Sequence, residues 1–202
     1  ASGGTLTMLW HKTAGPIIMA SMTDYWLKEP HNMQLSLKKS QHQSLVPRLE
    51  LTLETKKYAS CYDYTPCITA EETNGEIKIR SEMELKDMMH QPSDHHVFGC
   101  LEYTVTDHYV KITGVTKALS NTVPAFILPV IGKHHMGISE TKEGFMIPRE
   151  SGVLQINISN KDNIEKPQPI FCLSGGFEAW EFVIKPDESG MLQVTIQVEE
   201  EK

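Results

Sequence analysis

The sequence predicts an all-β protein, a large antiparallel β-sandwich of the supersandwich-like type with about a dozen strands and little helix. Apolar residues alternate with polar residues along short segments throughout the chain, which is the period of a strand with one buried face. Gly, Pro, Asn and Asp fill the intervals between these segments, as they do between antiparallel strands. No internal repeat of fixed period occurs, and this argues against a propeller or a solenoid.

The alternating segments define the expected strands in chain order. They are Thr5–Trp10, Pro16–Met22, Pro47–Thr55, Ile68–Glu72, Glu76–Leu85, Phe98–Thr106, Tyr109–Thr116, Ala125–Ile131, Phe145–Pro148, Val153–Ser159, Glu178–Ile184 and Met191–Val198. Asn74-Gly75 lies between two of these strands and supplies the positive φ values of a tight hairpin turn. We expect Asp107-His108 to close another hairpin.

One segment carries two patterns. Ser81 and Glu84 have the spacing of a helix capping box, but Ile77, Ile79 and Met83 fall on alternate positions. We interpret the segment as a strand, because the alternation is the longer of the two patterns.

The chain of 202 residues is long enough to bury a complete core, and we expect residues 1–202 to form a single β-sandwich domain. The long polar stretch from Lys28 to Ser44 and the Pro-bearing stretch from Asn160 to Pro169 are expected to be surface loops. The sequence opens on Ala-Ser-Gly-Gly without the basic and apolar start of a signal peptide, so we expect a mature or excised piece.

The expected core collects the apolar residues of the alternating strands. It contains Leu6, Met8, Ile17, Leu49, Leu51, Ile77, Ile79, Val105, Val110, Ile112, Phe126, Leu128, Ile156, Phe182, Val194 and Ile196. Trp10 and Trp180 stand two residues from other apolar strand residues, so we expect both indoles to face inward. Trp26, beside the long polar loop, is the tryptophan suited to stack on a sugar ring.

The charge balance bears on the class of partner. Nineteen Lys and Arg against 26 Asp and Glu leave a formal net charge of -7, and the pairs Lys38-Lys39 and Lys56-Lys57 are isolated. Nucleic acid is therefore not an expected partner, because phosphate binding needs a clustered basic surface. No apolar stretch approaches the length that spans a bilayer, so we expect no membrane segment.

Histidine and cysteine are the candidate metal ligands. The histidine pairs His95-His96 and His134-His135 could join His11, His90 or His108 at a metal, but adjacent strand residues point to opposite faces and no His-x-His spacing occurs. The four cysteines are Cys61, Cys67, Cys100 and Cys172, which lack zinc-site spacing. We therefore predict no metal and no cofactor; a disulfide between Cys61 and Cys67 stays open.

Acid-base catalysis needs polar side chains that converge in a cleft. The candidates by residue type are Tyr25, Tyr62, Tyr64, Tyr103, Tyr109 and His11. Nothing in their spacing brings them together, and the sequence has no Gly-x-Ser-x-Gly elbow, phosphate loop or dinucleotide fingerprint. We interpret these residues as half-buried sheet positions and expect the isolated chain to be inactive.

Two phrases resemble one known family. Residues 9–16 (Leu-Trp-His-Lys-x-x-Gly-Pro), followed by 20–25 (Ala-Ser-Met-Thr-x-Tyr) and 29–34 (Glu-Pro-His-Asn-Met-Gln), are similar to the β-sandwich region of heparinase II/III-like proteins. Residues 171–180 (Phe-Cys-Leu-Ser-Gly-Gly-Phe-Glu-Ala-Trp) resemble the end of that region.

The resemblance implies a parent protein. Such proteins couple an α/α toroid to a large sandwich and cleave acidic polysaccharides by β-elimination, with Tyr and His from both parts. The chain would be the C-terminal fragment of a bacterial, periplasmic or secreted polysaccharide lyase, without the toroid. The family's catalytic residues do not match positions of this sequence one by one.

Two functions follow. In the first, the domain is noncatalytic and braces or completes the glycan site of a larger carbohydrate-active protein, with an acidic polysaccharide or the upstream helical domain as partner. The alternative is a stand-alone carbohydrate-binding module. In both, the loop after Tyr25 offers hydrogen-bonding groups around a stacking ring. The expected contacts are Tyr25, Trp26, Lys28, Glu29, His31, Asn32 and Gln34.

Overall fold

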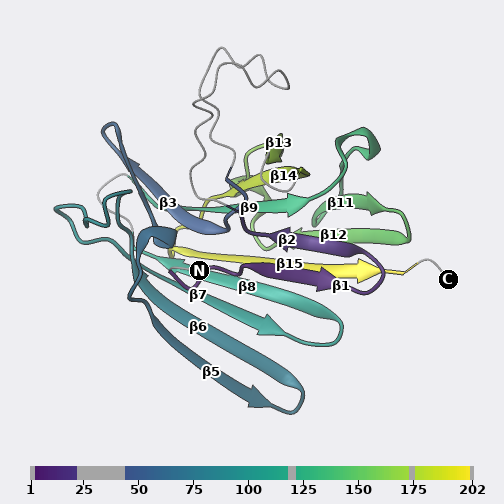
Figure 1. The fold of residues 1–202 in the computed structure, drawn as a ribbon, viewed down its shortest axis with the longest axis horizontal. Coiled ribbons are helices and arrows are strands. Elements are labelled where there is room, and N and C mark those ends of the chain that lie inside the picture. Colours follow the sequence, from purple (N-terminus) through teal and green to yellow (C-terminus); the bar gives the residue numbers. More distant parts are fainter. Residues whose placement is uncertain (1–2, 22–43, 118–121, 173–175, 201–202) are drawn as a thin grey trace.

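A computed structural model describes residues 3–21, 44–117, 122–172 and 176–200, and nearly all the regular secondary structure in these ranges is strand (Figure 1). Fifteen strands pair antiparallel throughout, which confirms the predicted all-β class. The strands are β1 (Met8–His11), β2 (Gly15–Met19), β3 (Arg48–Leu53), β4 (Lys56–Ala59), β5 (Cys67–Thr73), β6 (Glu76–Glu84), β7 (Phe98–Val105), β8 (Tyr109–Thr116), β9 (Ala125–Ile131), β10 (Ser139–Glu140), β11 (Gly144–Arg149), β12 (Gly152–Ile158), β13 (Gln168–Cys172), β14 (Phe177–Ile184) and β15 (Met191–Glu199). Three single-turn 3-10 helices are η1 (Ser60–Tyr62), η2 (His134–Met136) and η3 (Lys161–Asn163).

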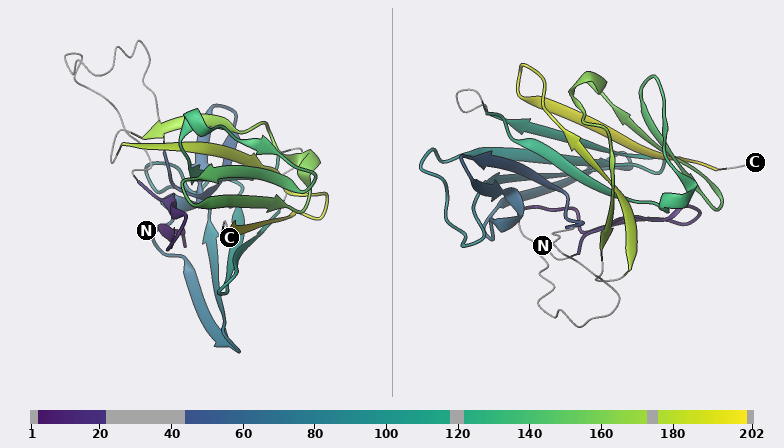
Figure 2. Two further views of the ribbon diagram at one scale, coloured as in Figure 1. Left: turned by 90° about the vertical axis from the view of Figure 1, so that its right-hand side faces the viewer. Right: turned by 90° about the horizontal axis from the view of Figure 1, so that it is seen from above.

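The strands form two large sheets and a hairpin. One sheet has eight strands in the order β10-β11-β12-β15-β8-β7-β6-β5, and the other has five in the order β13-β14-β9-β3-β4. The five-stranded sheet lies across part of the eight-stranded sheet, and the β1–β2 hairpin lies beside β9 (Figures 1 and 2). The β5–β6 hairpin forms one edge of the eight-stranded sheet, where β6 pairs with β7, and it extends beyond the five-stranded sheet; we call this hairpin the ribbon.

The core fills the space between the two sheets. Phe126 and Phe182 are fully buried there, and the ring of Phe182 packs edge-on against Phe145 at 5.4 Å between centroids. The expected core residues that prove buried are Ile17, Leu49, Leu51, Val110, Ile112, Phe126, Leu128, Ile156, Phe182, Val194 and Ile196. Leu6, Ile79 and Val105 are partly buried and pack against the same cluster.

Three residues that were predicted to point into the core are exposed. Met8 and Trp10 are 62% and 59% exposed, because the β1–β2 hairpin turns its other face, with Leu9 and Ile18, toward the core. Ile77 is 41% exposed, because the five-stranded sheet does not extend over the ribbon. Trp180 is buried as predicted.

Both predicted hairpin turns form. Asn74 and Gly75 adopt φ values of 52° and 79° between the paired residues Thr73 and Glu76, and Asp107-His108 connects β7 to β8. The segment with two patterns is strand β6, as predicted.

The expected loop at 160–169 needs correction. It contains η3, and β13 begins at Gln168. β13 is an edge strand, which is where a residue such as Pro169 can enter a sheet without breaking a ladder. Short strands β4 and β10 were also not expected from the sequence.

Candidate functional site

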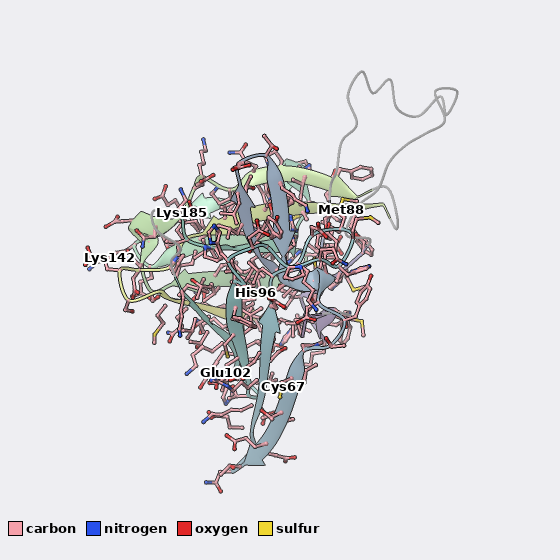
Figure 3. All side chains as sticks on the ribbon, turned by 90° about the vertical axis from the view of Figure 1, so that its left-hand side faces the viewer. Cys67, Met88, His96, Glu102, Lys142 and Lys185 are labelled. Carbon is pink, nitrogen blue, oxygen red and sulfur yellow. The ribbon has the colours of Figure 1, made fainter. Side chains whose placement is uncertain are left out.

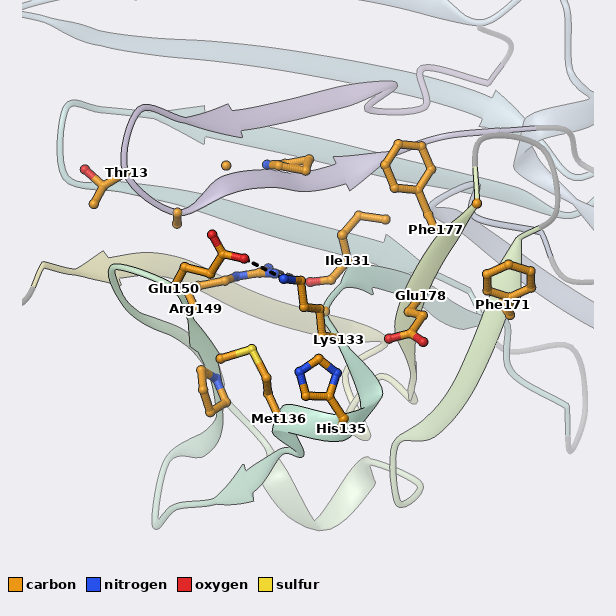
Figure 4. Close-up of a pocket in the computed structure, with 16 residues that line it drawn as sticks. Thr13, Ile131, Lys133, His135, Met136, Arg149, Glu150, Phe171, Phe177 and Glu178 are labelled. Carbon is orange, nitrogen blue, oxygen red and sulfur yellow. Dashed lines mark hydrogen bonds and ion pairs between the residues drawn. The ribbon is translucent and has the colours of Figure 1, made fainter.

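A pocket of about 600 Å³ opens at one end of the sandwich, where four turns meet (Figure 4). Its walls come from residues 13–16 of the β1–β2 turn, 131–136 after β9, 148–150 at the end of β11, and 171 and 176–178 from β13 and β14. Segments far apart in the chain therefore share one cavity, within the size range of small-molecule sites.

Arg149 is the central polar group of this pocket. It ends β11 on the inward side, in phase with the buried Phe145 and Ile147, so the strand carries a guanidinium into the space between the sheets. One nitrogen, Nη2, donates to the carbonyl oxygen of Ile131 at 2.5 Å, and this bond ties β11 to the end of β9 across the two sheets. Its Nε is buried without a hydrogen-bond partner.

The charge of Arg149 is not matched by a carboxylate. No ion pair within the described ranges includes Arg149, although its neighbour Glu150 pairs with Lys133 at 2.5 Å. Burial lowers the pKa of Arg149 to about 10, so the side chain remains protonated at neutral pH but is short of solvation. An incoming anion would supply the counter-charge.

The other charged wall residues already have partners. Glu178 accepts a hydrogen bond from the backbone N–H of His134 at 2.7 Å, while Nε2 of His134 contacts the carbonyl oxygen of Ala179 at 2.9 Å. These bonds fix η2 beside β14, and His135 lines the cavity next to them.

Apolar groups complete the walls. Pro16, Met136 and Phe177 line the pocket, and Phe171 stands at its rim with part of its ring exposed. Gly132 is needed at the floor, because a Cβ there would lie 2.9 Å from Ile147 and 3.0 Å from the indole of Trp180. The pocket thus combines apolar walls with the carboxylate of Glu178 and the guanidinium of Arg149, which has no ion-pair partner among the described residues.

The β1–β2 turn is fixed by its own polar contacts. Nδ1 of His11 accepts hydrogen bonds from the backbone N–H groups of Thr13 and Ala14 at 3.2 and 3.3 Å. The hydroxyl of Thr13 donates to Glu200 at 2.7 Å, which joins the turn to the end of the chain after β15. His11 therefore helps to hold the β1–β2 turn in place.

Such a site is suited to recognising an acidic group. A guanidinium offers parallel N–H donors that match a carboxylate or another planar anion, and its charged hydrogen bonds are strongest where water is excluded. The apolar walls beside it can pack against the carbon face of a ring.

A second, larger pocket of about 810 Å³ lies on the outer face of the eight-stranded sheet. It includes the exposed ring of Phe98, but its buried ammonium and its buried carboxylates already have polar partners. Lys86 pairs with Asp63 at 2.9 Å, and Nδ1 of His96 lies 2.7 Å from Glu84. The first pocket is the better candidate of the two because it holds a half-buried cation, Arg149, that has no ion-pair partner within the described residues.

Comparison with known proteins identifies the relatives of the chain. The family model "Ulvan lyase C-terminal domain" matches residues 1–199. The chain belongs to this family. A broad-specificity ulvan lyase of Formosa agariphila is 29% identical over 163 residues, which cover 77% of this chain and 24% of that protein. The chain thus matches about a quarter of the length of this curated relative.

Membership of the ulvan lyase C-terminal domain family supports the predicted type of protein, a β-sandwich domain of a polysaccharide lyase. This family match supports a polysaccharide lyase domain in general and not specifically a heparinase II/III-like protein. The two phrases that carried that resemblance, 9–16 and 171–180, both contribute walls to the first pocket. The three short helices of the described residues include none long and apolar enough to cross a membrane.

The predicted contact residues of this family member are not placed by the structure. Tyr25, Trp26, Lys28, Glu29, His31, Asn32 and Gln34 all lie outside the described residues. Their role in binding stays a prediction.

The acid-base candidates within the described ranges do not share a cleft. Tyr62 is buried near η1, and Tyr64 is exposed and stacks on His90 at 4.2 Å between ring centroids. Tyr103 points inward from β7, where burial raises the pKa of its hydroxyl, while Tyr109 lies on the outer face of β8. Their arrangement offers no converging acid and base.

The metal and cysteine candidates are likewise dispersed. Within the described residues no three His, Cys, Asp or Glu side chains are grouped as metal ligands. Cys61 is buried and Cys67 is exposed, and no disulfide joins them. His134 and His135 lie in η2, and His96 lies in the loop before β7.

Sequence reasoning missed Arg149. The predicted strand Phe145–Pro148 ends one residue before β11 does, so it does not include Arg149. The alternation Phe145, Ile147, Arg149 was present in the sequence and places all three on the inward face.

Proposed function

We propose that the chain is the noncatalytic β-sandwich domain of a larger polysaccharide lyase, and that its first pocket binds an acidic group of the polysaccharide. The observation that supports this proposal is the unpaired, half-buried guanidinium of Arg149 in a cavity with apolar walls. The match to about a quarter of an ulvan lyase favours a part of a larger protein over a stand-alone binding module.

The proposal includes a heparinase II/III-like parent that is periplasmic or secreted. In such a parent the catalytic acid and base come at least partly from outside this chain, since the Tyr and His candidates described above do not converge. The isolated chain then binds acidic glycan without releasing unsaturated sugar.

Calorimetric titration of the chain with acidic oligosaccharides prepared from ulvan tests the proposal. Arg149→Gln removes the cation while keeping a polar side chain, and its loss of a charged hydrogen bond should weaken binding by about 10- to 100-fold. Lys142→Gln is the matched control, because Lys142 is exposed and lies outside the first pocket. Its affinity should match that of the unmodified chain.

A second experiment changes the ligand instead of the protein. Oligosaccharides whose uronic carboxylates have been reduced to alcohols should bind the unmodified chain and Arg149→Gln equally weakly. A thermal melt of each variant checks that the lost bond to Ile131 has not unfolded the sandwich. Unchanged affinity for the acidic oligosaccharide in a folded Arg149→Gln variant would refute the assignment.

A further inference from the structure

The β5–β6 ribbon has two faces of opposite character. On its outer face, Lys78 pairs with Glu76 at 3.1 Å and Arg80 pairs with Glu82 at 2.9 Å, so charges cover the strands. In Figure 3 the strands that carry Cys67 and Glu102 form the tapered end of the molecule. This outer face is a solvated sheet surface.

The inner face of the ribbon is apolar and uncovered. Ile68 lies opposite Ser81 and Ala70 lies opposite Ile79, in register with the core-facing side of β6. Ile68 and Ile77 are nevertheless 54% and 41% exposed, and every residue of β5 is exposed. Ile79 of the same face is partly buried and packs against the core, so we call the exposed Ile68, Ala70 and Ile77 the inner ribbon face.

Such a face is unusual on a surface that meets only water. An antiparallel sheet normally carries polar residues on its solvated side and apolar residues on its covered side. The inner ribbon face follows the covered pattern, yet the five-stranded sheet ends before reaching it. Contiguous exposed apolar residues of this kind mark contact surfaces.

The beginning of the described chain runs beside this face. The N–H of Gly3 donates to the carbonyl oxygen of Asp63 at 2.6 Å, at the root of the ribbon. A Cβ on Gly4 would lie 2.0 Å from Oγ of Ser81, the inward residue directly opposite Ile68. The described chain therefore begins, at Gly3, next to the inner ribbon face.

We propose that the upstream part of the same polypeptide packs against the inner ribbon face. The inference rests on the proposed function, in which this chain is one domain of a longer lyase, and the curated relative is about four times as long as the matched region. The occupant presents apolar side chains to Ile68 and Ile77, with a hydrogen-bond donor or a basic group opposite Glu72 at the tip.

Cysteine labelling compares the full-length protein with the 202-residue chain. Ile68→Cys places a thiol on the inner ribbon face, and Thr69→Cys, its neighbour, places one on the outer face as the matched control. Both variants carry Cys67→Ser, because Cys67 is itself exposed. Alkylation at each position is followed by peptide mass spectrometry.

In the 202-residue chain both thiols should react at similar rates. In the full-length protein the thiol at 68 should react at least about 10-fold more slowly while the thiol at 69 changes little, since alkylation follows exposure. Equal reactivity of position 68 in both proteins would overturn the proposal. So would protection of position 68 in the 202-residue chain that grows with concentration, because the occupant would then be a second copy.

The labelling experiment and the glycan-binding experiment can fail independently of each other. Binding of acidic oligosaccharide through Arg149 is measured on the 202-residue chain and does not involve the inner ribbon face. Loss of glycan binding with intact protection at position 68, or the reverse, identifies which of the two proposals fails.

Discussion

The middle of the eight-stranded sheet and its β5–β6 edge carry the same strand alternation but differ in what covers them. Around β8, β15 and β12 the inward residues meet the five-stranded sheet, and Ile112, Val194 and Ile156 are buried. On β6 the inward Ile77 meets solvent. The apolar alternation therefore indicates which face of each strand points inward. Whether the residues on that face are buried within this chain depends on how far the five-stranded sheet extends over them.

The largest effect should come from truncation in the covered half. Ile112→Ala removes a fully buried side chain from β8 and should lower the free energy of unfolding by about 2 to 5 kcal/mol, from lost transfer energy and the cavity left behind. Urea denaturation measures the difference. A change below about 1 kcal/mol would mean that the two sheets are not tightly packed at β8.

Asp63 lies just before β5 and makes several polar contacts there. Its carboxylate accepts hydrogen bonds from the backbone N–H groups of Glu84 and Thr65 and pairs with Lys86 at 2.9 Å. Asp63→Asn leaves Lys86 without its charge partner and should cost about 2 to 3 kcal/mol near neutral pH.

The cost of Asp63→Asn should depend on pH. Burial alone would raise the pKa of Asp63, but the N–H of Glu84 and the ammonium of Lys86 outweigh it and hold the pKa below the ordinary value of 3.8. A depressed pKa in the folded state adds stability above the unfolded pKa and loses it as the pH falls through the folded pKa. Denaturation curves should show a gap between variant and unmodified chain that narrows below about pH 4; a gap independent of pH would exclude this coupling.

Gly132→Ala tests the pocket end of the covered half. The added methyl group would press on Ile147 and on the indole of Trp180, and overpacking of this kind costs about 1 to 3 kcal/mol. The melting temperature should fall and the near-ultraviolet circular dichroism of Trp180 should change. Gly137→Ala, where a Cβ would meet open space, isolates backbone strain because its φ is 73°. An unaltered Trp180 spectrum in Gly132→Ala would show that the indole does not touch Gly132.

The smallest effect is expected on the ribbon. Ile77→Ala in the 202-residue chain should lower the free energy of unfolding by about 1 kcal/mol or less, because Ile77 is already 41% exposed and loses less buried apolar surface than the fully buried Ile112. It is the matched partner of Ile112→Ala, the same substitution on the same side of the same sheet. If Ile77→Ala costs as much free energy of unfolding as Ile112→Ala, the inward face of β6 is packed as tightly as that of β8, and the comparison is wrong.

Local patterns predicted most of the strands, because period-two alternation and turn residues such as Asn74-Gly75 act over a few positions. They failed where the outcome depends on distant segments. Trp10 has the alternation of a core residue, but the packing of the β1–β2 hairpin decides which of its faces is buried. β13 was not predicted, because Pro169 within it and Pro167 just before it are typical of a loop, whereas an edge strand tolerates proline.

The pocket could not be assembled from sequence, because its walls come from four separate turns that only the sheet order brings together. Arg149 was predictable in part, since its phase with Phe145 and Ile147 places it inward. Its missing counter-charge was not predictable, because ion pairing depends on which carboxylates lie nearby in space.

The Nε–H resonance of Arg149 in nitrogen-15 spectra tests the central claim most directly. This group is buried without a hydrogen-bond partner, so an anion that engages the guanidinium should shift its signal markedly. Titration with acidic ulvan oligosaccharide should move the Arg149 signal to saturation, with the affinity found by calorimetry, and the carboxyl-reduced oligosaccharide should leave it in place. An Arg149 signal that stays fixed while the acidic oligosaccharide binds would show that the glycan site lies elsewhere on the domain.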